Sequence, residues 1–442
     1  MLQRIIENFV WELDGWIIII SSLVALNTAL LGNFLVLRKL SMVGDAISHA
    51  VLPGLALAFI IFASREGSLM LLFAAIFGIL TVLASELLRS KAGVDEGAAL
   101  GVVFVSFFAL GLVLIVKASE IVDLDPSCVL FGSVELAALS RVDFSIFESI
   151  HISVPPSSIR LSLLLLINSI FVYFLYKELV LSSFDYKFAK AQNRKPQLLH
   201  YVLLSLVALT AVISFEIVGN ILVVAMFVIP PAAAHLLTNR LNVIIWISLI
   251  FSVFVSFCGH LSAVLFPSIF GFGSTSTAGM IASISGILFI LLLFFSPRTG
   301  IIIRIIALLR MRFQIAMDDY LAAWYRFEES VSANEQDNLS QKNLITNNRS
   351  FFLLSRVMGY LKSYDNLKDH FVLGARGRKR AERIISNHRL WELYLNQEAG
   401  ITLQDVHDHA DGFEHHTNLL LQGNLRTDTQ SAKKDPHGKI IP

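Results

Sequence analysis

Long apolar runs fill most of residues 16–296, and they constrain the fold more than any other feature of this chain. Nine of them are long enough, or nearly so, to span about 30 Å of hydrocarbon. They lie at 16–37, 50–63, 68–88, 98–116, 160–181, 198–218, 219–237, 241–266 and 278–296. Because hydrocarbon leaves backbone polar groups unpaired, such runs span as helices. The sequence therefore predicts an all-α, polytopic membrane bundle, whose short second helix extends back before residue 50.

The remainder of the chain has a different composition. The 442 residues are 55% hydrophobic, which is above the value of about 45–50% for soluble domains. This excess is confined to the membrane part, because residues 311–442 have the mixed composition of a soluble, mainly helical domain. Asn, Ser, Gln and Glu dominate 331–350, which we interpret as a loop. We therefore expect a membrane domain followed by one soluble domain.

Positive charge orients the membrane part. One set of loops together with the tail carries thirteen Lys and Arg residues, and the opposite set carries five. The first set is Arg38, Lys39, Arg89, Lys91, Lys187, Lys190, Arg194, Lys195, Arg240, Arg298, Arg304, Arg310 and Arg312, and the second is Arg4, Arg65, Lys117, Arg141 and Arg160. Cytoplasmic loops are the positive ones. We therefore expect the N-terminus outside, the C-terminal domain in the cytoplasm, and an acidic outer loop at 118–159 with a re-entrant or interfacial helix at 127–140.

The Gly32–Leu57 segment places charged residues between two apolar runs. Asp45 and His49 are four residues apart, so they share one face of a helix. Ionisable groups at membrane depth are costly and usually functional, and this pair suits a divalent ion in transit. The alternative interpretation is that Asp45 caps the following helix and His49 satisfies a buried carbonyl group.

The Val218–Arg240 segment contains the consecutive prolines Pro230 and Pro231. Proline inside a helix removes a hydrogen bond, so this pair is expected to end or bend the helix before Arg240. A kinked helix with an arginine reaching the membrane surface is the alternative interpretation.

Both segments closely resemble the permeases of zinc-, manganese- and iron-type metal ABC importers. The resemblance implies that Asp45 and His49 lie on the transport path, and that the region of Pro230, Pro231 and Arg240 docks on an ATPase. It also implies an extracytoplasmic metal-binding protein and a second permease subunit. The chain has no GxxxxGK[ST] phosphate loop, so we expect no ATP hydrolysis by this chain and a separate ATPase subunit.

Histidines and carboxylates gather in the soluble part. On helices, His388 and Glu392 share one face, and so do His407, Asp411, Glu414 and His415. Two helices that present such faces to each other can hold a divalent metal ion. A solvated surface pair is the alternative interpretation for His388 and Glu392.

Residues 376–442 resemble the metal-binding and dimerisation region of the diphtheria-toxin-repressor family. The matching phrases are Gly377–Ile384, His388–Leu395, Val406–Asp408, Glu414–His416 and the Asp435–Gly438 ending. The resemblance implies one metal site at His388, Glu392 and His407. It implies another at Asp411, Glu414 and His415, joined by Asp319. The resemblance implies Mn²⁺ or Fe²⁺ rather than Zn²⁺ in this domain. Iron-type members have Cys where Asp411 stands, and oxygen suits harder ions such as Mn²⁺, so the resemblance leans to the manganese branch. The expected carboxylate three residues after Asp319 is replaced by Ala322.

The same resemblance implies a degenerate winged helix-turn-helix at 313–375. Its recognition helix is expected at Ser350–Leu361, with Arg349, Arg356 and Lys362 near the phosphates of operator DNA. The predicted domains are thus a permease at 1–300, the winged helix at 313–375, and a metal-binding and dimerisation domain at 376–442.

Three functions remain open at this level. The first is an inner-membrane metal permease fused to a metal-dependent repressor, which acts as a dimer after proteolytic release near Arg298–Arg312. The second is a permease whose C-terminal domain senses metal and regulates transport without binding DNA. The third is a proton-coupled carrier that needs no ATPase.

Overall fold

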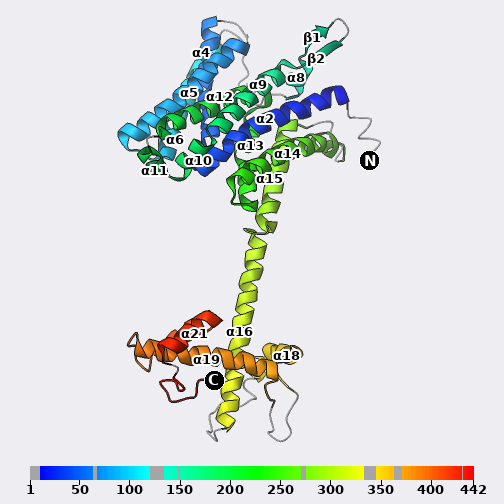
Figure 1. Cartoon of the computed structure of the whole chain (residues 1–442). Helices are drawn as coiled ribbons and strands as arrows, with labels where there is room; N and C mark the ends of the chain where they lie inside the picture. The colour runs from blue at the N-terminus through cyan, green and yellow to red at the C-terminus, as the bar shows by residue number, and fades with distance from the viewer. Residues whose placement is uncertain are drawn as a thin grey trace. The chain divides into compact units, whose positions relative to one another are not determined.

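The computed structural model describes residues 10–62, 67–119, 134–147, 150–192, 194–269, 275–332, 345–362, 371–430 and 432–442. The chain divides into two compact units, residues 1–303 and 304–442 (Figure 1). Both units are helical, so the predicted all-α class is confirmed, with one small β-hairpin in addition.

Unit 1 contains the apolar helices. They are α2 (Trp11–Leu37), α3 (Val43–Ala50), α4 (Leu52–Phe62), α5 (Gly67–Ala92), α6 (Glu96–Ser119), α9 (Pro156–Phe174), α12 (Pro196–Val218), α13 (Asn220–Leu237), α14 (Leu241–Ile269) and α15 (Thr277–Phe295). Shorter helices are α8 (Val134–Leu139), α10 (Tyr176–Phe184) and α11 (Tyr186–Ala191). Among the described residues, nine helices are long and apolar enough to cross a membrane, and α3 and α4 together form one of them at Val43–Phe62. The expected backward extension of the second helix is therefore confirmed.

The predicted outer loop contains structure that the sequence pattern did not reveal. Its described residues form α8 and an antiparallel hairpin of β1 (Val142–Phe147) and β2 (Ile150–Val154). Val134 and Ala138 of α8 are buried. The proposed helix at 127–140 is therefore seen only as α8, because 127–133 lie outside the described residues, as do the acidic residues Glu120, Asp123 and Asp125.

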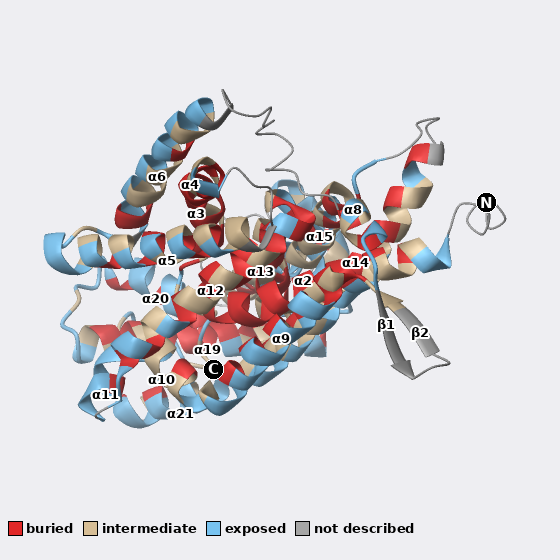
Figure 2. Cartoon of the chain, turned by 90° about the horizontal axis from the view of Figure 1, so that it is seen from above, coloured by how far each residue is buried: buried red, intermediate tan, exposed pale blue. Residues whose placement is uncertain are grey.

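Helix α2 lies at the centre of unit 1. It packs against α8, α9, α12, α13 and α14, and Figure 2 shows buried residues along α2, α12 and α13. Buried amides tie it to its neighbours: Asn27 Nδ2 donates to Leu161 O on α9, and Asn33 Nδ2 donates to Ser248 Oγ on α14, at 3.1 and 2.7 Å. Such paired polar groups stabilise helix contacts where surrounding lipid provides no hydrophobic drive.

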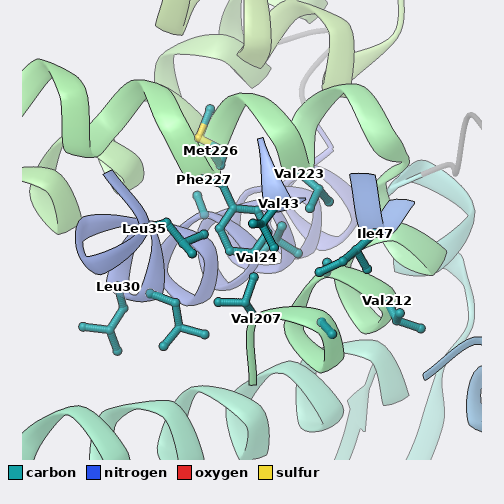
Figure 3. Packing of buried hydrophobic residues seen from close by; sticks show 14 of the residues in the cluster. Val24, Leu30, Leu35, Val43, Ile47, Val207, Val212, Val223, Met226 and Phe227 are labelled. Atoms are coloured by element: carbon teal, nitrogen blue, oxygen red, sulfur yellow. The ribbon is translucent and has the colours of Figure 1, made fainter. Parts of the chain in front are cut away.

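The two segments that resemble metal importer permeases, Gly32–Leu57 and Val218–Arg240, meet where α2 crosses α13. A Cβ atom built on Gly32 would lie 2.3 Å from Phe227 O, and one on Gly44 would lie 2.9 Å from the Phe227 ring. Pro231 has no N–H, so it cannot bond the carbonyl of Phe227 four residues earlier. That carbonyl faces Gly32 instead, and Figure 3 shows the Phe227 ring among the apolar side chains of this core.

Unit 2 is built on part of α16 (Ile301–Ser332), α18 (Arg349–Val357), α19 (Ala375–Gln397), α20 (Val406–Glu414) and α21 (Leu419–Asp428). Its core contains Met317, Tyr320, Leu321, Trp324, Phe352, Leu361, Leu373 and Ala381. Leu361 and Leu373 also form an antiparallel bridge. The side chains that α16 buries here fix the face on which Asp319 can meet α20.

Gly32→Ala is predicted to destabilise unit 1. The added methyl group cannot fit 2.3 Å from a backbone oxygen, and overpacking of this kind costs about 1–3 kcal/mol. Gly15→Ala in the same helix is the control, because a Cβ at Gly15 meets nothing within 4 Å. Thermal melting of the detergent-solubilised chain, followed by size-exclusion chromatography, measures the difference. Equal melting temperatures for both variants would contradict the close helix contact.

Candidate metal centre

Asp45 and His49 both lie on α3, on one face as the sequence predicts. His49 Nε2 is 3.6 Å from Asp45 Oδ1, and about half of the Asp45 side chain is exposed. The His49 ring packs edge-on against Phe108 at 5.5 Å between centroids. Its Nδ1 has no hydrogen-bond partner among the described residues. The pair offers few ligands and remains accessible.

Pro230 and Pro231 do not end α13, which continues to Leu237. Of the two expected effects, an end or a bend, the first does not occur at the prolines themselves, because a helix can pass through proline when other contacts hold its backbone. One such contact is at its end, where Leu236 O accepts from Ser296 Oγ and Thr299 Oγ1 at 2.6 and 3.0 Å. Arg240 is exposed just before α14 begins at Leu241.

His388 is the centre of the cluster in unit 2. Its Nε2 lies 3.1 Å from Glu392 Oε1 and 2.8 Å from His407 Nδ1. Its Nδ1 lies 3.2 Å from Asp411 Oδ1 and 2.6 Å from Glu414 Oε2. One imidazole ring therefore joins the two ligand sets that the sequence kept apart. Asp411 lies with His388 and Glu414, whereas the sequence grouped it with Glu414 and His415.

A second group forms around His415. Its Nε2 is 2.9 Å from Asp319 Oδ1 and 3.2 Å from Glu414 Oε1. The ligand atoms of Asp319, Glu414 and His415 all lie within 4.8 Å of one another. The neighbouring Asp318 is instead paired with Arg380, and the Ala322 side chain is buried against Ile384 and Ile385. This group therefore has no ligand at Ala322.

The packing of α20 on α19 explains why these side chains converge. Val406 and Ala410 are fully buried and turn one face of α20 toward α19. Asn387 Nδ2 donates to Glu414 O at 3.2 Å, and the Trp391 ring stacks on Phe413 at 4.8 Å. Asn387 and Trp391 position the centre, and sequence reasoning did not assign them that role. The only sequence signal for this role was that each of them directly precedes a candidate ligand, His388 or Glu392, on α19.

The carboxylates around His388 change its protonation. Burial alone would lower the pKa of His388, but Glu392 and Glu414 outweigh burial and raise it to about 9. Burial would raise the pKa of Glu392, whereas His388 and His407 lower it to about 2. The hydrogen bond to Asp319 raises the pKa of His415. The metal-free cluster is thus held together by imidazolium–carboxylate pairs.

These residues fit a divalent cation. His388 Nδ1 and Glu414 Oε2 are buried and close together, yet neither makes a hydrogen bond of normal geometry within the part of the chain described. Side-chain nitrogen and carboxylate oxygen atoms around one point are the ligands that Mn²⁺ and Fe²⁺ accept. His388, Glu392 and His407 would hold one ion, and Asp319, Glu414 and His415 another, with Asp411 beside His388 and Glu414.

The expected DNA-contacting residues lie on or next to α18. The helix spans Arg349–Val357, so the expected extension to Leu361 is wrong: the chain turns at Gly359, whose φ is +72°. Arg349, Arg356 and Lys362 are exposed, and the Arg356 guanidinium lies 5.5 Å from the centre of the Phe371 ring. Most of the expected 331–350 loop falls outside the described residues, as does part of the segment where the winged helix is expected.

Comparisons with known proteins agree with both resemblances. Residues 12–296 match the model of the ABC 3 transport family, and residues 375–442 match that of the iron dependent repressor, metal binding and dimerisation domain. The manganese transport system membrane protein MntD of Bacillus subtilis is 37% identical over 300 residues, which are 68% of this chain and 97% of that protein. The zinc transport system membrane protein TroD of Treponema pallidum is 34% identical over 323 residues, 72% of this chain and 85% of that protein.

A solved structure shows the same membrane architecture. PsaBC from Streptococcus pneumoniae, in complex with a Fab, is 27% identical with a TM-score of 0.53, and the match covers 68% of this chain and 98% of that one. The similarity of this chain to the permease and repressor families, predicted from its sequence, is therefore confirmed.

Metal binding to unit 2 is predicted to release protons. With a pKa of about 9, His388 is protonated at neutral pH, and an ion can bind only the neutral ring. The apparent affinity for Mn²⁺ should therefore rise as pH increases toward 9. Calorimetry in buffers of different ionisation enthalpy measures the released protons. An affinity that does not change between about pH 6 and pH 8 would contradict this assignment.

Proposed function

Because this chain belongs to the ABC 3 transport family, we propose that residues 1–300 are the permease of an ABC importer for Mn²⁺, Fe²⁺ or Zn²⁺. The Asp45–His49 pair on α3 carries this proposal. The pair lies within a membrane-length helix, and its two ligands can bind a divalent ion without trapping it. Relatives named for manganese and zinc transport support a metal cargo.

The proposed importer needs further subunits. A separate ATPase hydrolyses ATP and docks at Pro230, Pro231 and Arg240, where α13 ends and α14 begins. An extracytoplasmic metal-binding protein delivers the ion, and a second permease subunit completes the translocation path. The excess of Lys and Arg supports a cytoplasmic location for Arg240 and unit 2 at a bacterial inner membrane. A proton-coupled carrier would instead function without an ATPase, so co-purification of an ATPase distinguishes the two.

Replacement of both path residues is predicted to stop transport. The double variant Asp45→Asn, His49→Ala should lower ⁵⁴Mn²⁺ uptake by at least about tenfold, since loss of a metal-site group costs 10–100-fold. Ser48→Ala on the same helix is the control, because the Ser48 hydroxyl only bonds Asp45 O within α3. Membrane insertion and ATPase binding should be unchanged in both variants. Wild-type uptake by the double variant would exclude this transport path.

For the C-terminal part we propose a metal-responsive regulator. Its metal-binding and dimerisation domain spans 376–442, and a degenerate winged helix at 313–375 precedes it. The arrangement of His388 between two ligand sets supports this proposal, together with the match to a metal-binding and dimerisation domain. With Mn²⁺ or Fe²⁺ bound, the domain would form a dimer and present Arg349, Arg356 and Lys362 to the phosphates of operator DNA.

A second candidate function has its own support in the turn before α16. Ser296 and Thr299 both bond Leu236 O at the end of α13, which is the proposed ATPase-docking region. Helix α16 starts at Ile301 and carries Asp319, a proposed metal ligand. Metal bound at Asp319 could therefore act on the docking region through one continuous helix. In that case the domain senses cytoplasmic metal and inhibits transport without binding DNA.

DNA retention separates the two functions. If the repressor function holds, residues 304–442 loaded with Mn²⁺ should select one operator-like sequence from a random duplex pool. Arg349→Ala and Lys362→Ala should weaken binding to every DNA sequence by the same factor, because phosphate contacts carry no sequence information. His388→Ala should abolish the metal dependence, and His409→Ala should not, since His409 belongs to neither ligand group. The sensor function holds under two conditions. No DNA sequence is selected, and added Mn²⁺ slows metal uptake by the full-length wild type but not by full-length His388→Ala.

A repressor tied to a membrane reaches only nearby DNA, so we further propose that unit 2 is released by proteolysis near Arg298–Arg312. Immunoblots of native cells against the C-terminus should show a soluble fragment of about a third of the 49.1 kDa chain, the share that 304–442 represents. Full-length protein in membranes with no soluble fragment would contradict release.

A further inference from the structure

A cleft of unit 2 that the proposed function does not use is lined by cationic side chains. It has a volume of about 1040 Å³ and lies between α16, α19 and α21. Five cationic residues line it against two carboxylates. The cations are Arg376, Lys379, Arg380, Arg383 and Arg426, and the carboxylates are Asp318 and Glu382.

The cations fall into two groups. Arg380 bonds Asp318 and the Tyr360 hydroxyl, and Arg426 donates to Ser386 Oγ at 3.2 Å. These two are therefore held by groups of the protein. In contrast, Arg376, Lys379 and Arg383 are exposed, and no ion pair holds any of them within the residues described.

The spacing of these three residues places them together on one face of α19. Positions i, i+3 and i+7 line one side of a helix, and like charges at such spacing repel each other. Arg376 and Lys379 also lie in the first turns of α19, where the helix macrodipole already disfavours positive charge. A multiply charged anion in the cleft would relieve the repulsion.

We propose that this cleft binds an anion that carries two or more phosphate groups. The three unpaired cations on α19 would contact its oxygens, and the fixed guanidinium of Arg426 would form the opposite side of the site. The volume accommodates a chain of phosphates rather than a single one. His415 also lines the cleft, which places the bound anion beside the proposed metal centre.

The probe for this site is inorganic tripolyphosphate. Calorimetry is done on the full chain in phosphatidylcholine nanodiscs, in chelator-treated buffer, so its outcome does not depend on metal binding. We expect saturable binding of one tripolyphosphate per chain, weakened by salt, and much weaker binding of orthophosphate. Lys379→Ala and Arg383→Ala should each weaken binding about tenfold, the effect of losing one charge-assisted contact.

Arg378→Ala is the matched control. It removes the same charge from the same turn of α19, but Arg378 pairs with Glu328 and does not line the cleft. Its effect should stay below about twofold, as for an exposed ion pair. Unchanged circular dichroism in all three variants excludes misfolding. Absence of saturable binding, or an equal loss in Arg378→Ala, would overturn the proposal.

Two further arms identify the source of the phosphate. If nanodiscs with cardiolipin, whose headgroup carries two phosphates, weaken tripolyphosphate binding in the wild type but not in Arg383→Ala, a lipid headgroup shares the site, which supports the proposal. If duplex DNA displaces bound tripolyphosphate at concentrations well below those at which tripolyphosphate itself binds, the cleft is part of a nucleic-acid surface, and the proposal is wrong.

Discussion

The backbone contact between Gly32 of α2 and Phe227 of α13 is the constraint on which the packing of unit 1 depends. A side chain at residue 32 would hold the two helices apart, and Pro231 leaves the Phe227 carbonyl without its helical partner. The same ring of Phe227 packs on Gly44 at the start of α3. The helix that presents Asp45 and His49 is thus placed by the helix that leads to Arg240. A shift of α13 at the end that leads to Arg240 could therefore reach the proposed ion path directly through packed atoms.

Unit 2 depends on a different kind of interaction, namely the pairing of buried charges. His388, Glu392 and Glu414 are all buried, and burial of unpaired charges is strongly unfavourable. Without metal, His388 balances the carboxylates by remaining protonated; a divalent ion would replace that proton. Each ion that displaced one proton would add one net positive charge beside the buried carboxylates, and hydrogen bonds would give way to metal coordination. This exchange gives a sensor two states without unfolding, because the buried charges are compensated in both.

Helix α16 gives the two units a chemical link that does not depend on how they are arranged. It begins just after the turn whose Ser296 and Thr299 bond the last turn of α13, and it provides Asp319 to the His415 group. A repressor and a transport sensor would use this helix in opposite ways. The first requires it to be cut, and the second requires it to stay whole. Under these two proposals, residues 298–312 would be cleaved in cells for the released repressor and intact for the transport sensor.

The sequence alone determined the nine membrane-length helices found among the described residues, the two family resemblances and the candidate ligand residues of unit 2, because each of these rests on local patterns. Apolar length identifies a span, and residues four apart share a helix face wherever that helix lies. The tertiary structure decided what depends on contacts between distant segments. It showed that α13 continues through Pro230 and Pro231, that α18 stops at Val357, and that the predicted outer loop contains a hairpin. It also joined the two ligand sets through His388, since only the packing of α20 on α19 brings Asp411 and Glu414 to the second nitrogen of that ring.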